Sequence, residues 1–147
     1  MERKVFNKTT PTEGGKHFIP LPSDARHYIH HDRINADKLF LYALIIDYYN
    51  LQEGFAFPSL ETLSVKYGKV PDTTSKHLDD LKEVGLINFP PEKGYYVPLI
   101  PLTDDDFFTA FPDAWGNYKE AIQRCDNRRK AAAERMRKWR QENGYTD

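Results

Sequence analysis

The sequence lacks most of the features that mark exported or membrane-spanning proteins. Its 147 residues include a single cysteine, Cys125, which excludes an internal disulfide framework and favours a reducing compartment. No apolar run approaches the ~18 residues that a membrane-spanning helix needs, and the first residues do not form a signal-like apolar stretch. We therefore expect a cytoplasmic protein that makes no contact with a membrane.

Net charge is also nearly absent. The 21 Lys and Arg residues against 22 Asp and Glu residues give a formal net charge of -1, so the whole chain has no general attraction for a polyanion. The charge is unevenly distributed, because residues 115–147 carry nine basic and five acidic side chains whereas residues 1–114 carry 12 and 17. Binding to nucleic acid would therefore depend on local groups of basic residues.

Motifs for enzyme chemistry are missing as well. The sequence has no Gly-rich phosphate loop, no Gly-x-Ser-x-Gly and no His-Glu-x-x-His. The adjacent aspartates at 104–106 suggest Mg²⁺ at most, and on a connector they do not converge. His27, His30 and His31 have helical spacing, but no Cys or carboxylate pair with ligand spacing accompanies them, so we interpret them as surface or capping residues. We expect no catalysis, no metal, no cofactor and no small-molecule substrate.

The hydrophobic pattern divides the chain into four segments. Residues 1–16, rich in Thr, Gly and charge, predict a flexible N-terminal arm. Residues 17–100 carry the apolar periodicity of a folded domain, and residues 101–114 predict an acidic, aromatic connector. Residues 115–147 predict a basic C-terminal helix, because they combine good helix formers with few breakers.

Three helices are expected in the domain. Apolar residues on every side of the segment 35–50 predict a central helix that is covered on more than one face. Ser59 and Gly68 are the expected N-cap and C-cap of a second, short helix. A third helix is expected to begin near Pro71 and to end at Gly85.

A hairpin is expected after the third helix. Two β-prone runs, at 86–89 and 95–99, flank the turn-forming residues 90–94. The predicted order is therefore helix, helix, turn, helix and hairpin.

Two stretches within this order carry a family resemblance. Residues 57–68 contain the motif Pro-Ser-x-x-x-Leu, and residues 73–87 contain His-Leu-x-x-Leu-x-x-x-Gly-Leu-Ile. These motifs resemble the winged helix-turn-helix family, in particular the DNA-binding domains of plasmid and phage replication initiators, of DnaD-like primosome proteins and of MarR-like regulators. The resemblance spans residues 35–100. It implies a mainly α fold with a small β-hairpin wing, here followed by a long C-terminal helix.

The resemblance also implies how DNA would be bound. In this fold the third helix enters the major groove, while residues around it contact phosphates. Asp79 and Asp80 on the same helix would repel phosphate. Base contacts are expected from residues 72–77, and the hairpin tip would reach an adjacent minor groove or phosphate. The expected DNA-binding residues are Lys66, Lys69, Asp72, Thr73, Ser75, Lys76, His77 and Lys93.

The C-terminal segment predicts an apolar seam along one face of its helix. Its members alternate at spacings of three and four residues, which is typical of a coiled coil. Arg129 and Ala132 also fall on this seam. The interpretation favours a dimerising helix, but a clamp on DNA phosphates, a lone solvated helix and packing against the chain's own domain remain open. The expected dimerisation residues are Trp115, Tyr118, Ile122, Cys125, Met136 and Trp139.

Together these patterns favour a homodimeric, sequence-specific protein that binds double-stranded DNA. It would act as a transcriptional regulator or a replication-initiation accessory of a bacterial plasmid or phage. The alternative is a protein–protein interaction module, built on a winged helix, that binds a host or phage protein rather than DNA.

Overall fold

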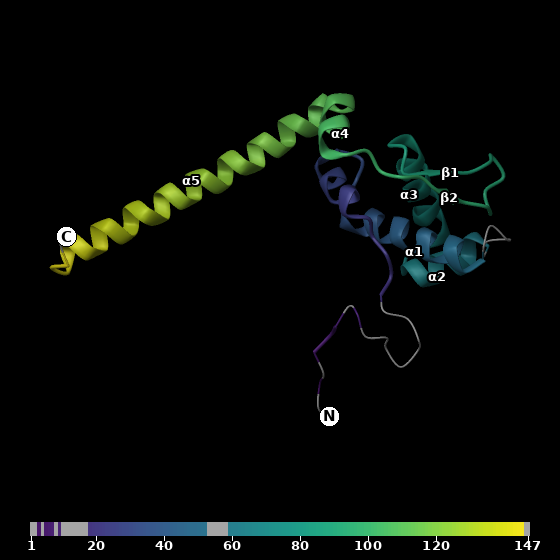
Figure 1. Cartoon of the computed structure of the whole chain (residues 1–147), viewed down its shortest axis with the longest axis horizontal. Helices are drawn as coiled ribbons and strands as arrows, with labels where there is room; N and C mark the ends of the chain where they lie inside the picture. Colours follow the sequence, from purple (N-terminus) through teal and green to yellow (C-terminus); the bar gives the residue numbers. More distant parts are fainter. Residues whose placement is uncertain (1–2, 4, 8, 10–17, 53–58, 146–147) are drawn as a thin grey trace.

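Helices dominate the chain, and a small hairpin lies between the third and fourth α-helices (Figure 1). The computed structural model describes residues 3, 5–7, 9, 18–52 and 59–145. Most of the expected N-terminal arm, 1–16, lies outside the described residues. The elements are the 3₁₀ helix η1 (Ser23–His30), α1 (Ala36–Gln52), α2 (Leu60–Tyr67), α3 (Pro71–Glu83), β1 (Ile87–Asn88), β2 (Val97–Pro98), α4 (Asp104–Ala110) and α5 (Pro112–Glu142).

Helix α1 lies at the centre of the domain, as its apolar pattern predicts. It contacts η1, α2, α3 and β2, and Leu41, Tyr42 and Ile45 are almost completely buried. The Tyr42 hydroxyl donates to the Leu99 carbonyl at 2.6 Å, which satisfies the one polar atom of a buried ring. Burial raises the pKa of Tyr42 to about 12. The helix therefore holds the segment that follows the hairpin as well as the neighbouring helices.

The predicted ends of α2 and α3 are confirmed. The Ser59 Oγ accepts from the Thr62 N–H at 3.2 Å at the start of α2. Gly68 ends α2 with φ +75°, in the left-handed region that glycine adopts without steric cost. Pro71 occupies the first turn of α3, and the Thr74 hydroxyl donates back to the Val70 carbonyl at 3.0 Å. These local caps fix the turn between the two helices.

The hairpin follows α3 and is shorter than its β-prone runs suggest. Ile87 pairs with Pro98 and Asn88 pairs with Val97, so each strand has two residues. Beyond Pro98, the Leu99 N–H still donates to the Leu86 carbonyl at 2.8 Å, so the backbone contact continues by one residue at this end. The resulting architecture, a mainly α fold with a small hairpin wing and a long C-terminal helix, confirms the predicted fold class.

The segment expected as a connector contains a helix that belongs to the core. The Thr103 Oγ1 accepts from the Asp106 N–H at 3.4 Å at the start of α4. Phe107 of α4 is fully buried, and its ring centroid lies 4.3 Å from that of Tyr28. His27 is buried beside them, with Nε2 2.9 Å from the Leu102 carbonyl oxygen. The interpretation of His27 as a surface or capping residue is therefore wrong, because η1 packs this ring against α4.

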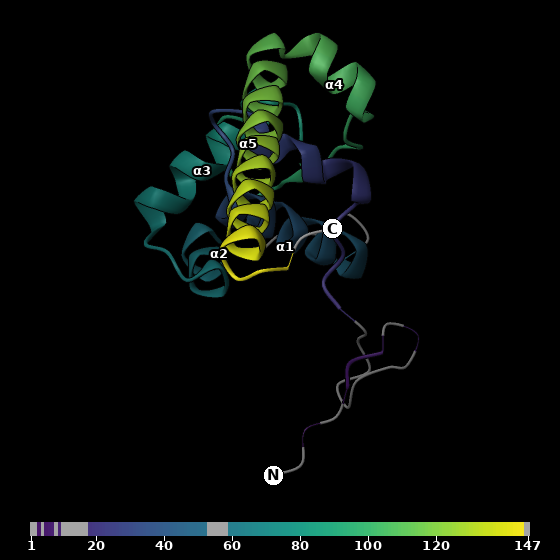
Figure 2. The same cartoon turned by 90° about the vertical axis from the view of Figure 1, so that its left-hand side faces the viewer.

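Helix α5 extends away from the rest of the molecule (Figure 1; Figure 2). Its first turns are fixed, because Ala114 is buried and the Asn117 amide donates to the His30 carbonyl and to Asp32, each at 2.9 Å. From Ile122 to residue 145 every side chain except Asp126 is exposed. Beyond the first turns of α5, the predicted seam therefore does not pack on the chain's own domain.

In the part of the chain that the structure describes, no helix combines the length and the apolar character needed to cross a membrane.

The burial of Phe107 predicts that α4 contributes to stability. Phe107→Ala should lower the free energy of unfolding by about 3–5 kcal/mol, since it removes a fully buried ring. Ile100→Ala is the control, because Ile100 is 92% exposed and should change stability little. Urea unfolding followed by circular dichroism measures both. Equal midpoints for the two variants would contradict this assignment of α4 to the core.

Candidate nucleic-acid interface

Helix α3 presents one buried face and one exposed stripe. Thr74, Leu78 and Leu81 are buried against the rest of the domain. Thr73 and Ser75 are half-buried at the sides of the exposed stripe. The exposed stripe, with members three or four residues apart, consists of Asp72, Lys76, Asp79 and Glu83.

The first half of α3 and the turn before it form a basic edge. Lys66 at the end of α2 and Lys76 in α3 are exposed, and neither makes an ion pair with another described residue. Lys69 lies in the turn, where its Nζ is 3.1 Å from an Asp37 carboxylate oxygen. Both side chains of this pair are substantially exposed, so the attraction is weak and the ammonium can exchange its partner for another anion.

The acidic residues in the second half of α3 are compensated within the domain. Asp80 accepts from Lys38 Nζ at 3.0 Å and lies 3.3 Å from Arg33 Nη1. Two cations that come from the start of α1 and the segment before it therefore neutralise a carboxylate on α3. These two ion pairs, which the sequence does not reveal, reduce the repulsion between Asp80 and phosphate that we expected.

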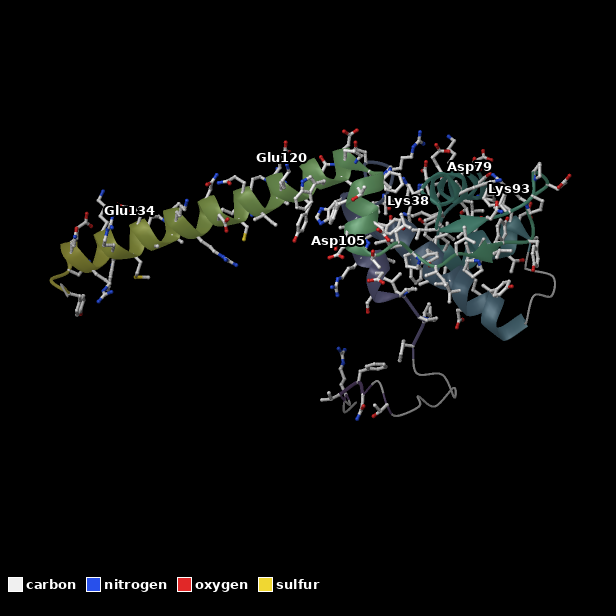
Figure 3. All side chains as sticks on the ribbon, turned by 45° about the horizontal axis from the view of Figure 1, so that its top comes forward. Lys38, Asp79, Lys93, Asp105, Glu120 and Glu134 are labelled. Carbon is white, nitrogen blue, oxygen red and sulfur yellow. The ribbon has the colours of Figure 1, made fainter. Side chains whose placement is uncertain are left out.

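Lys93 in the wing does not point away from the protein. Its Nζ lies 3.1 Å from an Asp79 carboxylate oxygen and donates to the Ser75 hydroxyl and carbonyl (Figure 3). Its backbone φ is +53°, and Gly94 follows with φ +112°. The wing therefore folds back on α3. Lys93 and Ser75, both expected at the DNA interface, satisfy one another, and Lys93 also balances Asp79.

Lys82 is held in a similar way. Its Nζ donates to the Phe89 carbonyl at 2.9 Å and lies 4.5 Å from the centroid of the Phe89 ring. Cation–π contact and this hydrogen bond together fix the ammonium against the wing. The second half of α3 is thus bound to the wing by two lysines.

His77 is turned towards α2 rather than towards the exposed stripe. Its Nδ1 lies 2.8 Å from the Tyr67 hydroxyl, and the two rings meet edge to face. Burial lowers the pKa of His77, and the positive charges of Lys38 and Lys69 lower it further, against the opposite effect of Asp80 and Asp37. The neutral imidazole is therefore favoured near pH 7, and the residue serves the packing of α2 on α3.

The predicted site residues thus separate into two groups. The open group, around the start of α3, is Lys66, Asp72, Thr73 and Lys76, together with Lys69, which is held only by its exposed ion pair with Asp37; the group with partners inside the protein is Ser75, His77 and Lys93. Arg33, Asp37 and Lys38 were not identified from the sequence, although they set the charge around α3. No local pattern reveals them, because Arg33 and Asp80 are 47 residues apart in the chain.

The structure also bears on metal binding. Over residues 18–52, 59–145 and the few described residues before them, no three His, Cys, Asp or Glu side chains are placed to hold a metal ion.

Comparison with known protein families identifies part of this region. Residues 32–87 match the model of a helix-turn-helix domain. The match covers α1, α2 and α3 and ends at the first residue of the hairpin. No curated protein and no solved structure was found to match the chain. The narrower resemblance to replication initiators, DnaD-like proteins or MarR-like regulators stays a prediction.

The histidine environments predict a pH-dependent stability. Burial is the main cause that lowers the pKa of His30, His31 and His77 in the folded chain. The unfolded chain, with a histidine pKa of about 6.5, then binds protons more readily, so the free energy of unfolding should fall as the pH drops below this value. Urea unfolding between about pH 7.5 and pH 5.5 measures how steeply the free energy of unfolding depends on pH. His77→Gln should reduce this pH dependence, because it removes one of the three histidines. An unchanged slope in this variant would contradict the assignment to His77.

Proposed function

We propose that this chain, whose residues 32–87 form a helix-turn-helix domain, is a sequence-specific protein that binds double-stranded DNA. The observation that carries the proposal is the basic edge at the start of α3, where Lys66, Lys69 and Lys76 surround open polar side chains. A helix in this position enters the major groove with its N-terminal residues against the base edges.

Each open residue has a chemical role in this arrangement. Lys76 donates to the acceptors of a guanine or to a phosphate, and the Thr73 hydroxyl serves either base or backbone. Asp72, in the first turn of α3, accepts from a cytosine amino group. Lys66 and Lys69 contact phosphates, and Lys69 exchanges Asp37 for the DNA backbone.

The ion pairs in the second half of α3 permit this approach. Arg33 and Lys38 compensate Asp80, and Lys93 compensates Asp79. Within the exposed stripe, Glu83 then lies at the far end of the helix, away from the basic edge. Repulsion of phosphate is in this way limited to a part of α3 that need not enter the groove.

The family resemblance of the sequence motifs supports a proposal for the biological role. We place the protein in the cytoplasm as a homodimer, acting as a transcriptional regulator or a replication-initiation accessory of a bacterial plasmid or phage. It would act by binding alone, without catalysis or a cofactor. The proposed dimer contacts are the seam residues of α5, namely Trp115, Tyr118, Ile122, Cys125, Met136 and Trp139.

A second candidate function has its own support. The exposed stripe of α3 contains three carboxylates and one lysine, which suits the basic surface of a protein partner better than a phosphate backbone. In that case the winged helix would be a protein-interaction module. Titration with DNA separates the two candidates.

The direct test is a gel-shift titration of the full chain with duplexes from a random-sequence pool, at two salt concentrations. DNA binding predicts retention at low salt and a steep loss of affinity at high salt, because bound lysines release counterions. Enrichment of one sequence over rounds of selection would demonstrate specificity. Absence of binding even at low salt would overturn the proposal and favour the protein-interaction module.

Lys76 tests the placement of α3. Lys76→Ala should weaken binding to the selected duplex by about 1–3 kcal/mol if the lysine reads a guanine. Lys82→Ala is the matched control on the same helix, because its ammonium is already held by Phe89 and should matter less for DNA. Fluorescence anisotropy with selected and scrambled duplexes gives both values. Wild-type affinity for the Lys76 variant would contradict this placement.

Asp79 tests whether the duplex also approaches the wing. Asp79→Asn removes a carboxylate and frees Lys93, so affinity for DNA should rise several-fold and its salt dependence should steepen by about one charge. Asp113→Asn makes the same change of charge at the start of α5, away from α3, and serves as the control. If both variants bind like the wild type, the wing and the second half of α3 do not lie beside the duplex.

A further inference from the structure

The apolar seam of α5 is exposed along the free part of the helix. Trp115 and Ile122 are each 42% exposed, Met136 is 59% exposed and Trp139 is 52% exposed. Exposed large apolar groups on one face of a helix are typical of an interaction surface. Because α5 projects away from the rest of the described domain, this seam is open to another molecule (Figure 1).

The seam has the same spacing when it is read from either end. It runs through eight positions and is symmetric about Asn127. Two copies of α5 that lie antiparallel and centred on this residue therefore bring each seam position level with another one. The pairs are Trp115 with Trp139, Tyr118 with Met136, Ile122 with Ala132, and Cys125 with Arg129. Aromatic residues and Met136 meet towards the ends of the helix pair, and Arg129 lies opposite the small Cys125 in the middle.

The charges favour this direction of pairing. Residues 112–126 carry two basic and three acidic side chains, whereas residues 128–142 carry seven basic and two acidic ones. Parallel pairing would place the two strongly basic halves side by side, and Arg129 would face Arg129. Antiparallel pairing places each basic half beside a slightly acidic half. It also brings Arg129 of one copy within about 1.5 Å, along the axis, of the level of Asp126 of the other, which supplies the acid that a charged seam position requires.

The base of α5 offers a surface that suits the far end of a second copy. Phe108 of α4 packs against Trp115 and Tyr118, with ring centroids 5.2 Å apart in both cases. A hollow of about 590 Å³ adjoins Phe108 and Tyr118, and one of about 370 Å³ adjoins Phe108 and Trp115. Antiparallel pairing places Met136 of the second copy beside Tyr118 and Trp139 of the second copy beside Trp115. Their side chains would therefore fill the two hollows.

The rim of these hollows is mainly acidic. Asp24 and Asp104 line the larger hollow together with Arg26, and Asp105 lines the smaller one. Figure 3 shows Glu120 and Glu134 on one edge of α5 and Asp105 of α4 towards the other. The seam lies roughly opposite those two glutamates by helical spacing, and therefore on the side of α4. The basic residues 135–140 of a second copy would meet this acidic rim.

We propose that α5 pairs antiparallel with α5 of a second copy, and that Met136 and Trp139 of each copy dock beside Phe108 of the other. The pairing buries both seams and joins the basic end of each helix to the acidic base of its partner. It holds the two helix-turn-helix domains at opposite ends of a rod about 45 Å long. The inference specifies the proposed self-association and is independent of DNA binding.

Sedimentation of the full chain, without DNA, tests the pairing. A dimer is expected, and Trp139→Ala should raise its dissociation constant at least about tenfold, because a large aromatic group at the interface is lost. Gln141→Ala, on the opposite face of the same turn, is the matched control and should leave the dimer unchanged. Both residues are exposed in the single chain, so neither variant should alter folding. A monomer at all concentrations, or equal dissociation constants for the two variants, would overturn the inference and leave the DNA-binding proposal standing.

Disulfide trapping tests the direction. In a Cys125→Ser background, chains with Ile122→Cys are mixed with chains with Ala132→Cys and oxidised. Antiparallel pairing predicts crosslinks only in the mixture, because equivalent positions 122 in the two copies lie about 15 Å apart along the axis, beyond the reach of a disulfide. Crosslinking of either variant alone, without the mixed product, would indicate parallel pairing and would overturn the inference. DNA binding by the same samples is measured separately, so failure of one proposal does not obscure the other.

Discussion

The burial of α1 on several faces is the constraint from which the rest of the architecture follows. A helix that is apolar on all sides must be covered by other elements, and η1, α2, α3 and β2 supply that cover. Two hydroxyls in this core are satisfied by the backbone: the Tyr42 hydroxyl donates to Leu99, and the Tyr28 hydroxyl accepts from the Leu102 N–H at 2.8 Å. These two contacts direct the chain from the wing into α4, and so determine where α5 leaves the domain.

Charge compensation gives the domain its functional asymmetry. Residues 1–114 carry more acidic than basic side chains, yet the carboxylates of Asp79 and Asp80 are matched by cations from other elements. Exposed ion pairs of this kind add little to stability. Their effect is to leave the unbalanced positive charge at the start of α3, where a helix-turn-helix domain meets its partner. A nearly neutral chain can in this way present a basic edge.

The long helix adds a second asymmetry. Its first turns are held by Asn117 and by the aromatic contacts of Phe108, whereas its second half is exposed and strongly basic. The acidic and aromatic groups around α4 lie at the other end of the same helix. One chain therefore carries two surfaces of complementary charge, separated by the length of α5. This arrangement suits the reciprocal contacts of a two-fold dimer.

The sequence by itself determined the helix-turn-helix core, because the residues that begin and end its helices act on their own neighbours. Ser59, Gly68 and Pro71 fix φ or cap an N–H within a few residues, and such effects do not depend on the rest of the fold. Thr103 acts in the same way at α4, although the segment was expected to be a connector.

Only the tertiary structure decided which charged and polar groups remain available. It buried His27, turned His77 towards Tyr67, folded Lys93 onto Asp79, and left α5 beyond its first turns without cover from its own domain. The partners in these contacts come from different elements of the chain, so the packing of those elements, rather than any local pattern, sets which charges meet.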